Sequence, residues 1–222
     1  MDIGKNISEL KKRLPPGVKL VAVSKTKPNE IILEAYRAGQ VIFGENKIQD
    51  LVAKYEVLPK DIEWHFIGHL QSNKVKYIAP FINLIHGVDS LKLLKRINKE
   101  GVKNDRVIKC LLQFHIAEES TKFGLSEPEA EMLLRSEEYA ELKNVEIVGV
   151  MGMATYTEDE VQIRNEFRQL KNIFELLKIK FFSDSGSFAE ISMGMSDDYH
   201  IAIEEGSTMV RVGSRIFGTR NY

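Results

Sequence analysis

Residues 18–38 read VKLVAVSKTKPNEIILEAYRA, and this stretch decides the fold class. Its first part, 18–24, is a short apolar run rich in valine, which predicts a buried strand. A polar turn over 25–28 ends in a proline, and 29–38 then has the apolar spacing of a helix. A strand, a turn and a helix in this order are the repeating unit of parallel sheets, because a parallel connection needs a long crossover.

The same unit recurs along the chain. We expect strands at 18–24, 41–44, 64–67, 84–88, 107–114, 145–149, 180–183 and 209–212, with helices between most of them. Continuously apolar strands are typical of parallel sheets that are covered on both faces. Eight such units predict an α/β fold that is a single (β/α)8 TIM-type barrel rather than an open doubly wound sheet. We also expect an extra N-terminal helix over 1–14, the barrel over 18–218, and one domain over 1–222.

The composition narrows the class of protein. The 222 residues carry 31 Lys and Arg against 32 Asp and Glu, so the basic excess typical of proteins that bind nucleic acid or anionic membranes is missing. No apolar run approaches the roughly 18 residues of a bilayer-spanning helix, and the N-terminus lacks the apolar core of a signal peptide. The single Cys110 excludes an internal disulfide and a thiolate-built zinc site. We therefore expect a cytoplasmic protein with no nucleic-acid and no membrane partner.

Lys25 is the first candidate functional residue. In a barrel of this type, functional side chains lie where the strands end. Lys25 follows the first strand, and counting by twos from Val21 and Val23 puts it on their face of that strand. Partial burial at the barrel mouth would lower the pKa of its amine and make the amine a nucleophile toward an aldehyde. The alternative is a surface lysine that only ends the strand.

Two segments of small residues form the second candidate. They follow the last two predicted strands and comprise 192–196 (SMGMS) and Gly213-Ser214. Small residues let backbone N–H groups approach an anion, and the loops after strands seven and eight of such barrels often bind a phosphate together. The alternative is ordinary turn chemistry, and the charges of Asp197 and Asp198 disfavour a phosphate.

Arg211 and Met151 complete the candidates that the residues themselves indicate. Arg211 lies between two valines in the predicted eighth strand, where a charge is costly unless it is paired or contacts a ligand. An internal salt bridge and a ligand contact therefore both remain open. Met151 and its neighbours up to Met153 would suit the floor of a site for a flat apolar ring, although methionine is also ordinary core filler.

Five motifs together resemble a known family. They are VAVSKTKP (21–28), FGENKIQD (43–50), WHFIGHLQSNK (64–74), VGVMGMAT (148–155) and the whole of 181–218. This combination resembles the pyridoxal 5′-phosphate (PLP) homeostasis family, also called YggS/PROSC, over about nine-tenths of the chain. The resemblance implies the PLP-binding barrel that is shared with the N-terminal domain of alanine racemase.

The resemblance also implies roles for individual residues. Lys25 would hold PLP covalently as a Schiff base, and Arg211 would face the pyridine nitrogen. The other expected cofactor-binding residues are Asn46, His69 and Met151 near the ring, and Ser192, Gly194, Gly213 and Ser214 at the phosphate. PLP needs an amine, an anion site and a partner for its ring nitrogen, so the resemblance and the residues agree.

Three functions remain open. The resemblance implies a non-catalytic carrier that stores and delivers PLP, maintains vitamin B6 homeostasis and contacts PLP-dependent apoenzymes transiently. The alternatives are a fold-type III PLP enzyme such as an amino-acid racemase, and a sugar-phosphate lyase or aldolase with a Schiff-base lysine. An arginine does not protonate the ring nitrogen, because its pKa exceeds about 12. The chain also ends eight residues after Ser214, so we expect no second domain with an opposing acid or base, and a monomer.

Overall fold

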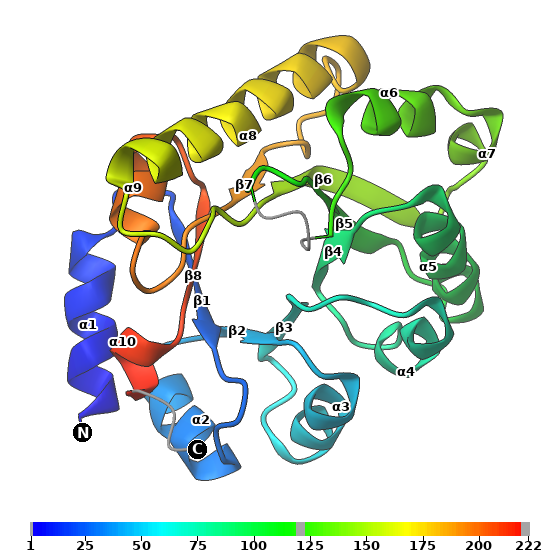
Figure 1. Cartoon of the computed structure of the whole chain (residues 1–222). Coiled ribbons are helices and arrows are strands. Elements are labelled where there is room, and N and C mark those ends of the chain that lie inside the picture. The colour runs from blue at the N-terminus through cyan, green and yellow to red at the C-terminus, as the bar shows by residue number, and fades with distance from the viewer. Residues whose placement is uncertain (1, 119–122, 219–222) are drawn as a thin grey trace.

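The computed structural model of the chain describes residues 2–118 and 123–218. Its eight parallel strands form a closed barrel, in which each strand pairs with the next along the chain and β8 pairs with β1. In Figure 1 the strands surround the centre of the molecule and the helices form an outer ring. The predicted (β/α)8 barrel is confirmed.

The strands are short, and their bounds are β1 (Lys19–Val23), β2 (Ile42–Glu45), β3 (Glu63–Phe66), β4 (Leu84–Val88), β5 (Ile108–Gln113), β6 (Val145–Met151), β7 (Glu190–Ser192) and β8 (Met209–Val212). The connecting helices are α2 (Asn29–Arg37), α3 (Ile48–Val57), η1 (Ser72–Lys74), α4 (Val75–Ile78), α5 (Leu91–Lys103), α6 (Glu127–Arg135), α7 (Glu137–Ala140), α8 (Glu160–Phe181), α9 (Tyr199–Glu204) and α10 (Ser214–Phe217). Within the described residues, none of these helices combines the length and the hydropathy needed to span a bilayer.

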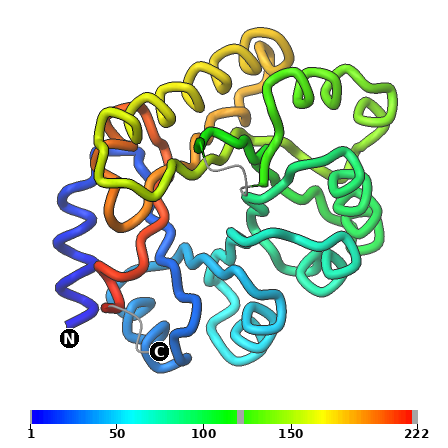
Figure 2. Tube along the Cα trace, in the orientation of Figure 1, coloured from blue at the N-terminus to red at the C-terminus, as the bar shows by residue number. Residues whose placement is uncertain are grey.

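The predicted N-terminal helix is also confirmed, as α1 (Ile3–Arg13). The Asp2 side chain accepts a hydrogen bond from the Lys5 backbone N–H and caps the helix. Asn6 donates to the backbone oxygen of Ile216 over 3.0 Å, which ties the first helix to α10 at the other end of the chain. Figure 2 shows these two helices side by side, so the first helix closes the ring beside the last.

The prediction of a strand at 180–183 is wrong. Helix α8 extends to Phe181, so the first half of the expected strand belongs to the end of this helix. Phe182 and Phe174 of α8 both stack on Phe188. The ring centroids lie 4.2 Å apart for Phe182 and 4.9 Å apart for Phe174. Phe181 thus belongs to α8, and Phe182 packs on Phe188 instead of joining the sheet.

The true seventh strand, β7, has three residues and almost no apolar pattern. Ile191 points outward into the core between barrel and helices, while Glu190 and Ser192 point into the barrel, where their polar partners lie. Because two of the three side chains are polar, the segment does not resemble a buried strand in the sequence.

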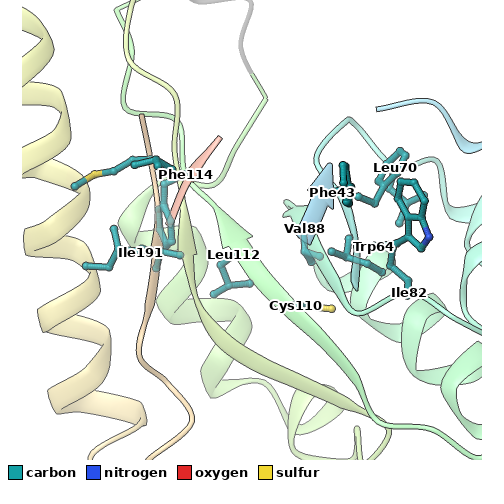
Figure 3. Close-up of a cluster of buried hydrophobic side chains, with 14 of the residues drawn as sticks. Phe43, Trp64, Leu70, Ile82, Val88, Cys110, Leu112, Phe114 and Ile191 are labelled. Carbon is teal, nitrogen blue, oxygen red and sulfur yellow. The ribbon is translucent and has the colours of Figure 1, made fainter. Parts of the chain in front are cut away.

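Alternation along the strands divides the core into two layers. The inward-facing side chains include Val21, Leu84, Leu111, Val148 and Met209, which pack against one another inside the barrel. Outward-facing residues form the larger layer beneath the helices, where Phe43 and Trp64 lie 5.9 Å apart. Figure 3 shows part of this outer layer, with Phe114 and Ile191 directed toward α8 and Trp64 directed toward Leu70 and Ile82.

The amino-terminal end of the barrel interior is charged rather than apolar. Lys19, Glu63, Lys109 and Glu190 come from the four odd-numbered strands and line a cavity of about 490 Å³ at this end. Layers of four side chains from alternate strands are the normal packing of such barrels. The two positive and two negative charges balance, and Lys19 bonds Glu190 directly. We therefore interpret this layer as a neutral closure of the barrel floor.

Candidate ligand-binding site at the barrel mouth

A cavity of about 390 Å³ lies at the opposite end, where the strands end at their carboxyl termini. This volume is within the roughly 300–1,000 Å³ typical of small-molecule sites. Five of the residues predicted as cofactor-binding line it: Lys25, Asn46, Arg211, Gly213 and Ser214. These residues follow or belong to β1, β2 and β8, which are neighbours in the closed barrel.

Lys25 lies where the alternation along β1 predicts. Val21 belongs to the barrel interior and Val23 lines the cavity, so the next residue on the same face reaches the mouth. The following turn is tight, because the Lys27 backbone N–H donates to the Ser24 backbone oxygen over 3.0 Å. Thr26 has a φ of 66°, a left-handed conformation that is unfavourable for a β-branched residue. Strain of this kind is common where a backbone presents a functional side chain.

A buried ion pair fixes the two strand ends that carry Lys25 and Asn46. Glu45 is fully buried, and its Oε1 lies 2.5 Å from the Lys54 amine of α3. The same amine donates to the Ser24 backbone oxygen over 2.9 Å, and the Ser24 hydroxyl donates to Glu45 Oε1 over 2.8 Å. Ser24 and Glu45 directly precede Lys25 and Asn46. One lysine of α3 thus joins both strand ends and limits their movement.

Arg211 is a buried cation beside the cavity. Its Nη1 donates to the Ser192 backbone oxygen over 2.8 Å and to the Ser192 hydroxyl over 2.7 Å, and its Nη2 donates to the Gly152 backbone oxygen over 3.1 Å. Burial lowers the pKa of its guanidinium to about 10, so the charge persists at neutral pH. No carboxylate within the described ranges forms an ion pair with it. Arg211 therefore forms no internal salt bridge within the described residues, and its hydrogen bonds go to Ser192 and Gly152.

The two Gly/Ser segments meet as predicted and form a polar pocket wall. The Gly213 backbone N–H donates to the Ser196 hydroxyl over 3.2 Å, which joins the segment after β7 to the one after β8. Gly194 has a φ of +91°, and a Cβ there would lie 2.5 Å from the Ala202 Cβ of α9, so glycine is required. Asp198 also lines the cavity, but its carboxylate accepts the Met195 backbone N–H.

Four predicted residues do not line the cavity. Met151 is buried in the barrel interior with Leu111 and Val148. Ser192 lies below the cavity, where it accepts from Arg211, and Gly194 instead allows close packing of α9. His69 stacks on Phe123 with 4.3 Å between the ring centroids, and its Nδ1 lies 3.7 Å from Asp89.

Several lining residues were not predicted. They include Lys27, Thr155, Tyr156, Ser196 and Asp198, whereas Met153, which the sequence suggested for the floor of a ring site, does line the cavity. Ser196 lies inside the small-residue segment 192–196, and Lys27 lies two residues after Lys25, in the turn that follows β1. The loop that carries Thr155 and Tyr156 had no signal beyond its place after the sixth strand. Glu166 of α8 holds this loop by accepting from the Thr155 backbone N–H and hydroxyl over 2.6 and 2.7 Å.

Two buried histidines extend the polar contacts of Arg211 through the barrel. His86 Nδ1 lies 3.0 Å from the Ser192 hydroxyl, and His86 Nε2 lies 3.0 Å from His65 Nδ1. Burial lowers the pKa of His65 to about 3 and that of His86 well below its usual value. Both rings are therefore neutral across the physiological range. In the described parts of the chain, no group of three or more His, Cys, Asp or Glu side chains could hold a metal ion.

The buried histidines predict a loss of stability in acid. Between pH 6.5 and about 3, His65 is protonated in the unfolded chain and neutral in the folded one, so the unfolded state binds more protons. Stability therefore falls as the pH falls through this window, by about 2 kcal/mol from His65 alone at pH 5 relative to neutral pH. Urea unfolding at pH 7 and pH 5 measures this change. In His65→Leu the change should shrink, and an equal pH response in both proteins would contradict the assignment.

Comparisons with known proteins identify the family. The family model described as the alanine racemase N-terminal domain matches residues 2–221. The pyridoxal phosphate homeostasis protein of Aquifex aeolicus is 41% identical over 206 residues, which cover 92% of this chain and 88% of the relative. The chain belongs to the family of pyridoxal phosphate homeostasis proteins. The Escherichia coli K12 protein of the same name is 37% identical over 214 residues, covering 95% of this chain and 89% of that protein.

Solved structures of a family member have the same fold. PipY of Synechococcus elongatus without PLP is 35% identical and covers 97% of this chain and 100% of its own, with a TM-score of 0.90. The same protein with PLP bound is 34% identical with equal coverage and has a TM-score of 0.87. The resemblance stated from the sequence motifs is thereby confirmed.

Proposed function

We propose that this protein binds PLP at the barrel mouth, holds it covalently on Lys25, and stores and delivers it to maintain intracellular PLP homeostasis. The observation that carries the proposal is that Lys25, Arg211 and the Gly213-Ser214 segment line one cavity. The name shared by the relatives and the PLP-bound structure of PipY support the same ligand.

The residues of the cavity fit the three parts of PLP. When bound, PLP supplies an aldehyde that condenses with a lysine amine and releases water, together with a phosphate dianion and a ring nitrogen. Lys25 supplies the amine. The hydroxyls of Ser196 and Ser214 supply donors for an anion, and the Gly213 backbone N–H holds the Ser196 hydroxyl in place. Arg211 supplies a fixed donor for the ring nitrogen, and Asn46 lies on the same cavity wall.

Arg211 suits a carrier because it leaves the ring a weak electron sink, although an arginine at this place does not forbid racemisation. A guanidinium with a pKa of about 10 donates a hydrogen bond but does not give up its proton to the ring nitrogen near neutral pH. An unprotonated ring withdraws electrons poorly, whereas racemisation depends on stabilising a carbanion. The alternative function is an amino-acid racemase, which the alanine racemase family model supports. A carrier is also what the name of the homologues suggests.

Amino-acid turnover distinguishes the two functions. The PLP-loaded protein is incubated with L- and D-alanine and with several other amino acids, and inversion is followed by chiral chromatography. We expect no inversion above that of free PLP, because the residues of the cavity are assigned to binding alone. Inversion at ordinary enzyme rates, roughly 1 per second or more, would refute the carrier assignment. An authentic alanine racemase serves as the positive control.

We further propose a single PLP-binding barrel domain over 1–222, which is a cytoplasmic monomer. The near-neutral charge supports the absence of a nucleic-acid partner. Transient contact with PLP-dependent apoenzymes would take place at the mouth, since the cavity opens there. Size-exclusion chromatography with light scattering tests the monomer.

A further inference from the structure

The middle of the barrel interior contains a continuous polar chain. Barrel interiors of this type are normally filled by branched apolar side chains. Here His65, Ser192, His86 and Arg211 face inward from four strands, and all four are buried. This chain of side-chain hydrogen bonds begins at Arg211 beside the ligand cavity and passes through Ser192 and His86. It ends at His65, which lines the cavity at the barrel floor.

The chemistry of Arg211 fixes the direction of every hydrogen bond in this chain. A guanidinium only donates, so the Ser192 hydroxyl oxygen accepts from Arg211 Nη1. The hydroxyl hydrogen of Ser192 then has His86 Nδ1 as its acceptor, 3.0 Å away. His86 therefore carries its hydrogen on Nε2 and donates to His65 Nδ1, also 3.0 Å away. In the reverse order Ser192 would accept twice, and its hydrogen would have no acceptor among its bonds in the described structure.

Each link depends on the one below it. If His86 did not accept from Ser192, the hydroxyl could rotate and point its hydrogen toward the Arg211 cation. His65 in turn keeps the hydrogen of His86 on Nε2 by presenting an acceptor. The Ser192 hydroxyl therefore stays an acceptor for Arg211 Nη1, and the Gly152 backbone oxygen is the acceptor for Nη2. Together these acceptors hold the long arginine side chain in one orientation.

We propose that Ser192, His86 and His65 are positioning residues that hold Arg211 in one orientation toward the ring of bound PLP. The inference rests on the proposed function, and it assigns a role to two histidines that PLP binding does not otherwise use. Each neutral ring carries one nitrogen-bound hydrogen, so His86 can accept at one nitrogen and donate at the other.

The first measurement needs no PLP. In the apoprotein, nitrogen-15 NMR of the histidine rings reports which nitrogen carries the hydrogen. We expect the Nε2–H tautomer for both His65 and His86. An Nδ1–H tautomer on His86 would overturn the proposed direction of the chain.

The second measurement uses variants of one position. In His86→Leu the acceptor for Ser192 is lost, whereas in His86→Gln the amide can accept from Ser192 and donate to His65. We expect His86→Leu to speed PLP release about tenfold, the order expected for weakening one hydrogen bond to a charged group, and to shift the visible absorption maximum of bound PLP. His86→Gln should restore the release rate to within about twofold of the wild type and return the absorption maximum to the wild-type wavelength.

Leu84→Ala is the matched control for packing. Leu84 lies in the same strand and faces the same interior, but it has no part in the chain. Its truncation should lower stability by about 2–5 kcal/mol and leave the release rate and the spectrum unchanged. Should His86→Leu not fold, Ser192→Ala takes its place with the same expected effects.

Unchanged release and spectrum in His86→Leu or its substitute would overturn the positioning role, as would equal changes in Leu84→Ala. If the wild-type protein did not bind PLP, the proposed function would fail instead. The NMR measurement on the apoprotein would still decide the direction of the chain, so the two failures are distinguishable.

Discussion

Lys25→Ala abolishes the tight covalent uptake of PLP at one equivalent, together with the visible absorbance of the loaded protein. The reason is chemical, because the cavity then loses the amine that bonds the aldehyde carbon. The remaining donors, which are Arg211 and the Gly213-Ser214 segment, hold PLP only by non-covalent contacts. We expect dialysis to remove PLP from the variant but not from the wild-type protein. Absorbance spectra before and after dialysis measure the difference.

Lys27→Met is the control for this prediction. Lys27 lines the same cavity two residues further along, but its amine donates to the Phe217 backbone oxygen over 3.0 Å. We expect this variant to retain the absorbance after dialysis. If Lys25→Ala and the wild type retained equal absorbance, Lys25 would not be the covalent site.

Lys54→Met should destabilise the protein by about 3–5 kcal/mol, the usual cost of leaving one member of a buried ion pair without its partner. The Glu45 carboxylate would remain fully buried, with its Oε1 bonded only to the Ser24 hydroxyl. Its other oxygen, Oε2, already has no hydrogen-bond partner within the described residues. Because Ser24 and Glu45 support Lys25 and Asn46, we also expect weaker PLP binding. Urea unfolding of the apoprotein measures the stability change.

A surface ion pair supplies the comparison. Lys5 and Glu9 lie 3.9 Å apart on α1 with exposed side chains. Exposed pairs contribute about 0–1 kcal/mol, so Lys5→Met should change stability by no more than this. Equal effects of Lys54→Met and Lys5→Met would show that the buried pair does not fix the strand ends.

The fold could be predicted from the sequence largely because parallel strands leave a strong pattern. The stretch 20–23 (LVAV) is continuously apolar, and 84–88 departs from an apolar run only at His86, since both faces of the sheet are covered. The pattern fails at β7, where two of the three side chains, Glu190 and Ser192, are polar and point into the barrel. Ser192 is polar because it accepts a hydrogen bond from Arg211, and Glu190 is polar because it pairs with Lys19. Neither partner can be deduced from the local sequence of β7.

The sequence predicts site residues correctly where the alternation of side chains along a strand places them, but not where the course of a loop places them. Lys25 and Arg211 lie on the cavity because every second residue of a strand shares a face. Met151 and Ser192 were placed on the cavity from their sequence neighbours, but they lie deeper in the barrel. Tyr156 lines the cavity through a loop whose course depends on Thr155 and Glu166, residues eleven positions apart. Such long-range contacts leave no periodic signal.

The covalent site on Lys25 is the central claim, and one measurement tests it directly. The wild-type protein is incubated with one equivalent of PLP, reduced with borohydride, digested and mapped by mass spectrometry. We predict one modified peptide, with the reduced PLP group on Lys25. A modification on another lysine, or no modification at all, would contradict the account.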